Sequence, residues 1–123
     1  MFATLAVAFV SSAVCFAQEP KEPNQGPPNL QEGAKREFEE ADAKLRGRYE
    51  ALLTQLDVDQ RKVLDDAHAQ WLAFRETAAK AMANLTAPSE EHYALLEFLE
   101  LHRLTEQRLE ALERIIEARR TAG

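Results

Sequence analysis

The chain has 123 residues, enough for one domain and too few for a multi-domain machine. Its hydrophobic share of 46% and charged share of 29% lie near the averages of globular proteins, so wholesale disorder is not expected. Fifteen Lys and Arg stand against 21 Asp and Glu, and the net charge of −6 argues against nucleic acid or an anionic membrane as the main partner, because both require a basic surface.

The first segment, residues 1–17, carries no charge and is almost entirely apolar or small. It is shorter than a typical transmembrane helix of about 20 apolar residues. An apolar core from Phe2 to Val14 and the small residue Ala17 favour a secretory signal peptide, although no Lys or Arg precedes Lys21 to form a positive n-region. We therefore expect an exported protein, periplasmic or secreted.

The single cysteine, Cys15, lies inside this leader. Ser12 and Val14 fit a lipoprotein attachment motif poorly. If the leader is cleaved after Ala17, no disulfide can form, and stability must come from packing alone.

Residues 18–29 contain four prolines, which deny the backbone donors that a helix or a strand ladder needs. We expect a flexible, extended tether there. From Leu30 onward apolar residues recur every three or four positions, which predicts a helical domain over residues 30–121.

Three amphipathic helices are predicted in this domain. The apolar stripe of the first comprises Phe38, Ala41, Leu45, Tyr49, Leu52, Leu53 and Leu56. Asp57, followed three residues later by Gln60, is a capping-box signature that starts the second. The second stripe comprises Leu64, Ala67, Trp71, Phe74, Ala78, Met82 and Leu85. A turn from Asn84 to Ser89 separates it from a third helix that runs to Arg120. Because the connectors are short, the expected fold is all-α, an elongated antiparallel three-helix bundle.

Polar side chains interrupt these stripes. Thr105 and Arg108 fall inside the apolar stripe of the third helix, and His68 and Arg75 flank Trp71. Asp42 has a similar border position on the first helix. Either the two arginines extend along the core and snorkel to water, or Asp42, Arg75, Thr105 and Arg108 form a network that fixes helix register. Trp71 and Tyr49 are expected to pack in the core rather than to stack on a ligand.

Four short motifs carry a resemblance to a known family. They are Leu45-x-x-x-Tyr49, Leu56-Asp57, Leu64-x-x-Ala67-x-x-x-Trp71-Leu72-Ala73-Phe74-Arg75-Glu76 and Leu104-Thr105-x-x-Arg108-x-x-x-Leu112. In this order they resemble the LprI-type lysozyme-inhibitor-like domain over about residues 40–116. The resemblance implies an exported helical protein, linked in some members to lysozyme inhibition.

The chain also departs from that family's pattern. The family usually has Gln at the position of His68 and Asn at that of Arg46. It commonly has cysteines near Ala79 and in the region of Glu100, and neither is present. The resemblance therefore implies a disulfide-free variant of the bundle.

Two acidic surfaces are candidate partner-binding sites. An outward row on the third helix comprises Glu106, Glu110, Glu113 and Glu117. Glu90 and Glu91 follow the second turn. A row of carboxylates would steer a basic partner such as lysozyme. The plain alternatives are a solvated helix face for the row and an ordinary helix cap for the pair.

The sequence offers little catalytic chemistry. His68 and Asp65 alone do not make a site, His92 and His102 are ten residues apart, and no Glu-x-x-His pair predicts a di-iron bundle. No phosphate loop or Ser-His-Asp pattern is evident. We expect a protein that is not an enzyme and needs no cofactor or metal.

Two functional classes remain. The first is an exported protein that binds another protein, by resemblance lysozyme. The second is a structural or assembly bundle that forms homo-oligomers through the first half of the third helix. Apolar residues surround that half almost completely: Tyr93, Leu95, Leu96, Phe98, Leu99 and Leu101.

Overall fold

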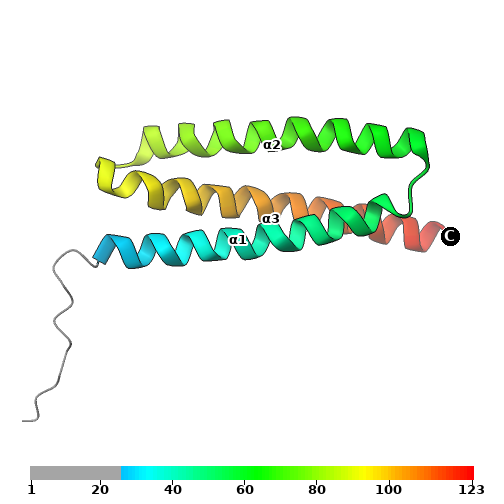
Figure 1. Ribbon diagram of the computed structural model, residues 1–123, viewed down its shortest axis with the longest axis horizontal. Coiled ribbons are helices and arrows are strands. Elements are labelled where there is room, and N and C mark those ends of the chain that lie inside the picture. Colours follow the sequence, from blue (N-terminus) through cyan, green and yellow to red (C-terminus); the bar gives the residue numbers. More distant parts are fainter. Residues whose placement is uncertain (1–25) are drawn as a thin grey trace, which may run out of the picture.

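The computed structural model describes residues 26–123, which form three helices and no strand. In chain order these are α1 (Gly26–Leu53), α2 (Val58–Thr86) and α3 (Glu90–Ala122). Figure 1 shows α2 running back along the molecule and α3 returning in the direction of α1. The predicted all-α three-helix bundle is confirmed. The predicted signal peptide and most of the predicted tether lie outside the described residues.

The first turn of α1 contains two prolines. The helix begins at Gly26, four residues before the expected start at Leu30, and so includes Pro27 and Pro28. The first four N–H groups of a helix have no partner within it, so proline removes little hydrogen bonding at these positions.

The turn between α1 and α2 is held by side chains as well as by the backbone. The Asp57 carboxylate accepts the Gln60 N–H at 2.8 Å, and Gln60 Oε1 accepts the Asp57 N–H at 3.2 Å, which confirms the predicted capping box. Arg61 Nε donates to the carbonyls of Leu53 and Leu56 at 2.9 and 3.1 Å. The carbonyl of the last α1 residue and that of Leu56 in the turn therefore gain a side-chain donor.

The second turn is capped differently. Ser89 is the N-cap residue of α3, but its hydroxyl accepts no hydrogen bond from the first turn. The hydroxyl lies 2.8 Å from His92 Nδ1 instead.

The apolar core lies between α1 and α3. Leu45 and Leu52 of α1 pack with Leu109 and Leu112 of α3, and all are buried. Five partly buried residues surround this cluster: Tyr49, Leu56, Leu64, Trp71 and Ile116. The backbone of α3 lies close to both other helices, whereas α1 and α2 approach each other closely at few points (Figure 1). None of the three helices is long and apolar enough to span a membrane.

The predicted apolar stripe of α2 is partly wrong. Three of its large side chains are exposed: Phe74 by 57%, Met82 by 41% and Leu85 by 85%. The buried residues of this helix are Arg75, Ala79 and Ala83, each one residue after a member of the predicted stripe. The spacing between packed helices depends on the side chains at the contact, and alanine lets α2 approach α3 closely. The small residues therefore take the inner face.

Candidate functional site

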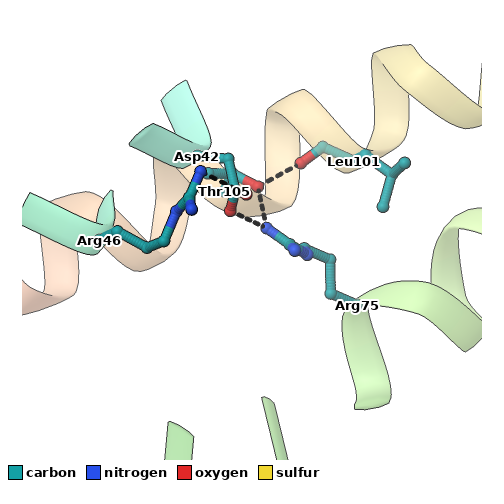
Figure 2. A network of polar contacts seen from close by, with 5 residues as sticks. All are labelled: Asp42, Arg46, Arg75, Leu101 and Thr105. Carbon is teal, nitrogen blue, oxygen red and sulfur yellow. Dashed lines mark hydrogen bonds and ion pairs between the residues drawn. The ribbon is translucent and has the colours of Figure 1, made fainter. Parts of the chain in front are cut away.

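A polar cluster joins all three helices near their midpoints, and Figure 2 shows its members. Arg75 Nη1 on α2 donates to the Asp42 carboxylate on α1 at 2.7 Å and to the Thr105 hydroxyl on α3 at 3.0 Å. The Thr105 hydroxyl donates to the carbonyl of Leu101 at 2.6 Å. Arg46 Nη2 lies 4.0 Å from the other Asp42 oxygen. One guanidinium on α2 thus contacts side chains of both other helices.

The surroundings of Arg75 are aromatic as well as polar. The residue is 8% exposed, so its side chain does not snorkel to water. The guanidinium carbon lies 5.1 Å from the ring centre of Phe38 and 5.0 Å from that of Trp71. The face of an aromatic ring attracts a cation, which offsets part of the cost of removing the guanidinium from water.

Arg108 was a member of the network in one of the two predicted alternatives, but it forms no hydrogen bond with Asp42, Arg75 or Thr105. Its guanidinium carbon lies 5.5 Å from the ring centre of Trp71, and its Nε is buried without a hydrogen-bond partner. None of the ion pairs formed within residues 26–123 includes it. Burial lowers the pKa of Arg108, and the neighbouring Tyr49 acts in the opposite direction. This cation is therefore partly desolvated and has no acidic partner within residues 26–123.

His68 extends the aromatic part of the cluster. Its ring stacks on Tyr49 with centres 4.2 Å apart and on Trp71 with centres 5.7 Å apart. Burial lowers the pKa of His68, and the positive charges of two nearby arginines lower it further. The Tyr49 hydroxyl donates to Asp65, and burial together with that hydrogen bond raises the pKa of Tyr49 to about 12. These groups connect α1 to α2 through the ends of long side chains.

The groups of this cluster contact one another across the three helices. Among residues 26–123, no set of three or more His, Cys, Asp or Glu is arranged to hold a metal ion. The two other histidines lie apart from the cluster: His92 contacts Ser89, and His102 lies 3.5 Å from Glu106.

The acidic row of α3 is exposed as expected, but its members differ in their partners. The row consists of Glu106, Glu110, Glu113 and Glu117. Glu113 pairs with Arg48 of α1 at 3.2 Å, and Glu117 pairs with Arg120. Glu110 forms no ion pair within residues 26–123, and the contact of Glu106 with a histidine is an ion pair only when that imidazole is protonated. Glu106 and Glu110 are therefore the members of the row without a permanent ion pair, and Glu110 lines a pocket together with Lys44, Arg48 and Arg114.

Glu106 also belongs to a groove between α1 and α3. Glu37, Glu40 and Lys44 of α1 line it from the other side, His102 of α3 lies beside Glu106, and its volume is about 210 Å³. We call this the acidic groove. Three carboxylates outweigh one ammonium group, so the groove presents negative potential to solvent. Glu37 and Glu40 were not among the candidates predicted from sequence, because acidic residues on an outer helix face are usually just solvated.

Glu90 and Glu91 form a separate acidic site. They are exposed in the first turn of α3, where negative charge complements the helix dipole. Glu106 is 16 residues further along, a rise of about 24 Å in a straight helix. The structure does not bring this pair together with the acidic row.

The apolar first half of α3 is mostly used inside the bundle. Phe98 contacts Phe38 with ring centres 6.3 Å apart, and the Tyr93 hydroxyl donates to the Lys80 carbonyl at 3.4 Å. Leu101 is buried. Leu99 is the exposed large side chain of this half.

The chain matches a known protein family. The profile of a protein family described as "Lysozyme inhibitor LprI" matches residues 18–112. This range includes the polar cluster and the acidic groove, and it ends before Glu113 and Glu117. No curated protein and no solved structure matches the chain.

Proposed function

The chain belongs to the LprI lysozyme inhibitor family, and from that premise we propose that it is an exported, non-enzymatic protein that binds and inhibits lysozyme. The family match, which covers most of the chain, is the observation that carries this proposal. Export is supported by the uncharged, apolar character of residues 1–17.

The proposed contact surface is the acidic groove together with Glu110. Lysozymes are usually basic, and this chain has a net charge of −6, so long-range attraction would accelerate their encounter. The groove is open to solvent, and a Lys or Arg side chain of the partner would enter it between Glu37, Glu40 and Glu106. All four carboxylates lie within the matched range.

The remaining candidates have a lesser part in this proposal. Glu113 and Glu117 are already paired with arginines of the chain, so less of their charge is available to a partner. Glu90 and Glu91 lie in another region of α3 and contribute only to the overall field.

A lysozyme turbidity assay with the purified protein tests the proposal. Inhibition is expected, and the double variant Glu40→Gln, Glu106→Gln should weaken it about three- to tenfold, because two exposed ion pairs are lost. The double variant Asp66→Asn, Glu76→Gln is the matched control, since it removes two exposed carboxylates from α2. Added salt should weaken inhibition steeply.

Two results would contradict the proposal. Absence of inhibition at micromolar excess would remove lysozyme as the partner. Inhibition that both double variants reduce equally would mean that net charge acts, and that the acidic groove is not the contact surface.

A structural role through self-association is the second candidate. Four exposed large apolar side chains on α2 and α3 favour it: Phe74, Met82, Leu85 and Leu99. Sedimentation or gel filtration separates the two classes. A monomer agrees with the inhibitor, whereas a stable dimer that Phe74→Gln dissociates would support assembly.

A further inference from the structure

A second groove opens beside the turn between α1 and α2. All three helices line it, its volume is about 460 Å³, and its wall is mainly apolar, with Leu52, Leu64 and Ile115 among its members. We call it the turn groove. Its volume falls in the range of small-ligand sites, about 300–1,000 Å³. It is distinct from the acidic groove, which lies between α1 and α3 alone.

Two guanidinium groups also line the turn groove, from Arg108 and Arg119. Arg119 Nη2 donates to the Gln55 carbonyl at 2.9 Å, while Arg108 has no acidic partner within residues 26–123. The Nε atoms of both are buried and unpaired. Asp59 is the lining carboxylate, and it forms no ion pair with either arginine.

A guanidinium that has lost part of its water and has no acidic neighbour is stabilised by an oxyanion, which accepts its hydrogen bonds and balances its charge. The groove places the partly buried guanidinium of Arg108 at the edge of an apolar wall. The matching ligand therefore has one anionic head and an apolar body.

We propose that the turn groove binds a medium-chain fatty acid, with the carboxylate on Arg108 and the alkyl chain along Leu52, Leu64 and Ile115. This site does not depend on the proposed inhibition of lysozyme, since the two surfaces share no residue.

The lining favours a fatty acid over an acidic peptide. A peptide brings a backbone N–H and C=O with nearly every residue, and each requires a partner when it is buried. The polar side chains of the turn groove are only Asp59, Gln60 and the two arginines. A fatty acid needs polar partners only at its head.

The protein contains its own reporter for this site. Trp71 is the single tryptophan of the chain, and the Arg108 guanidinium lies over its ring. A carboxylate that binds Arg108 should change the emission of Trp71. The probe is decanoate, titrated below its micelle concentration, with calorimetry to measure the stoichiometry.

Decanoate should bind saturably with one site per chain, and decanol, which lacks the charge, should bind at least about tenfold more weakly. Arg108→Gln should weaken decanoate binding about tenfold or more. Ile115→Asp places a negative charge on a partly exposed wall residue and should have the same effect without loss of folding. Arg114→Gln removes an exposed arginine of α3 outside the turn groove and should leave binding unchanged.

Equal affinity for decanoate and decanol would overturn the assignment of the carboxylate to Arg108. If Arg108→Gln and Ile115→Asp both fold and bind decanoate as tightly as the unchanged protein, the turn groove is not the binding site. Binding of an acidic peptide without any binding of decanoate would replace the fatty acid as the occupant and so reject the proposal.

Discussion

The guanidinium of Arg75 contacts a carboxylate, a hydroxyl and two aromatic rings, contributed by all three helices. Arg75→Met would leave the partly buried Asp42 without its partner. Loss of one member of a buried ion pair costs about 3–5 kcal/mol, and the partial exposure of Asp42 places the expected loss near the lower end. Urea denaturation measures this change in the free energy of unfolding.

Arg46→Met is the matched control for that measurement. Arg46 approaches the same carboxylate at 4.0 Å but is mostly exposed, so its loss should cost less than about 1 kcal/mol. Equal effects of the two substitutions would mean that the buried cluster does not hold the helices.

The lowered pKa of His68 implies that the free energy of unfolding depends on pH. Its folded-state pKa lies below the ordinary value because of burial and nearby positive charge. Below about pH 6.5, the unfolded chain therefore binds more protons at this residue than the folded chain does. The free energy of unfolding should fall as pH decreases through that value and level off below the folded pKa.

Melting temperatures between about pH 7.5 and about pH 5.5 test this expectation, because the window spans the unfolded pKa of histidine. His68→Gln should reduce the slope, whereas His92→Gln is the control, since His92 lies outside the aromatic cluster. An unchanged slope in His68→Gln would show that another group is responsible.

Some residues of the polar cluster and the acidic groove could be predicted from the sequence, and others could not. Asp42, Arg75 and Thr105 were recognisable because they interrupt or border apolar stripes. The separation of Arg108 from them was not, since hydrogen bonding depends on side-chain geometry that spacing along a helix does not define. Glu37 could not be distinguished from other solvated acids until α1 and α3 were placed side by side.

At the scale of helices, the two turns differ in how they are capped, and this difference can be measured. Asp57→Ala removes a side-chain acceptor from the first turn of α2 and should cost about 1 kcal/mol. Ser89→Ala should cost little, because the Ser89 hydroxyl caps no N–H of α3. Denaturant midpoints compare the two variants, and equal losses would contradict the assignment of the caps.

The face of α2 that is buried could not be predicted from hydrophobic periodicity alone. An apolar stripe predicts that a helix forms and is amphipathic, and this was correct for all three helices. It does not decide whether Phe74 or Arg75 faces the core, because they are adjacent residues. Here Ala79 and Ala83 are fully buried, and hydrophobicity alone does not distinguish Ala79 from Ala78, which belongs to the predicted stripe.

At the scale of the molecule, α3 is the helix on which the other two pack. It supplies six of the 13 buried side chains, more than either other helix, whereas α2 supplies only Arg75 and two alanines. Opening free energies follow local burial, so amide hydrogens in α3 should exchange most slowly and those of the exposed first half of α2 faster. Hydrogen exchange with peptide-level resolution measures this order. Uniform protection of all three helices would show that the bundle opens only as one unit.

The arginines at the α1–α2 turn have a consequence for acid conditions. Arg61 and Arg119 bind carbonyls there, and guanidinium groups keep their protons throughout the physiological range. His68, which stacks on Tyr49 and Trp71, gains a proton as the medium becomes acidic. Mild acidification should therefore loosen the contact between α1 and α2 at His68 first, while the end of the bundle at the α1–α2 turn keeps its structure.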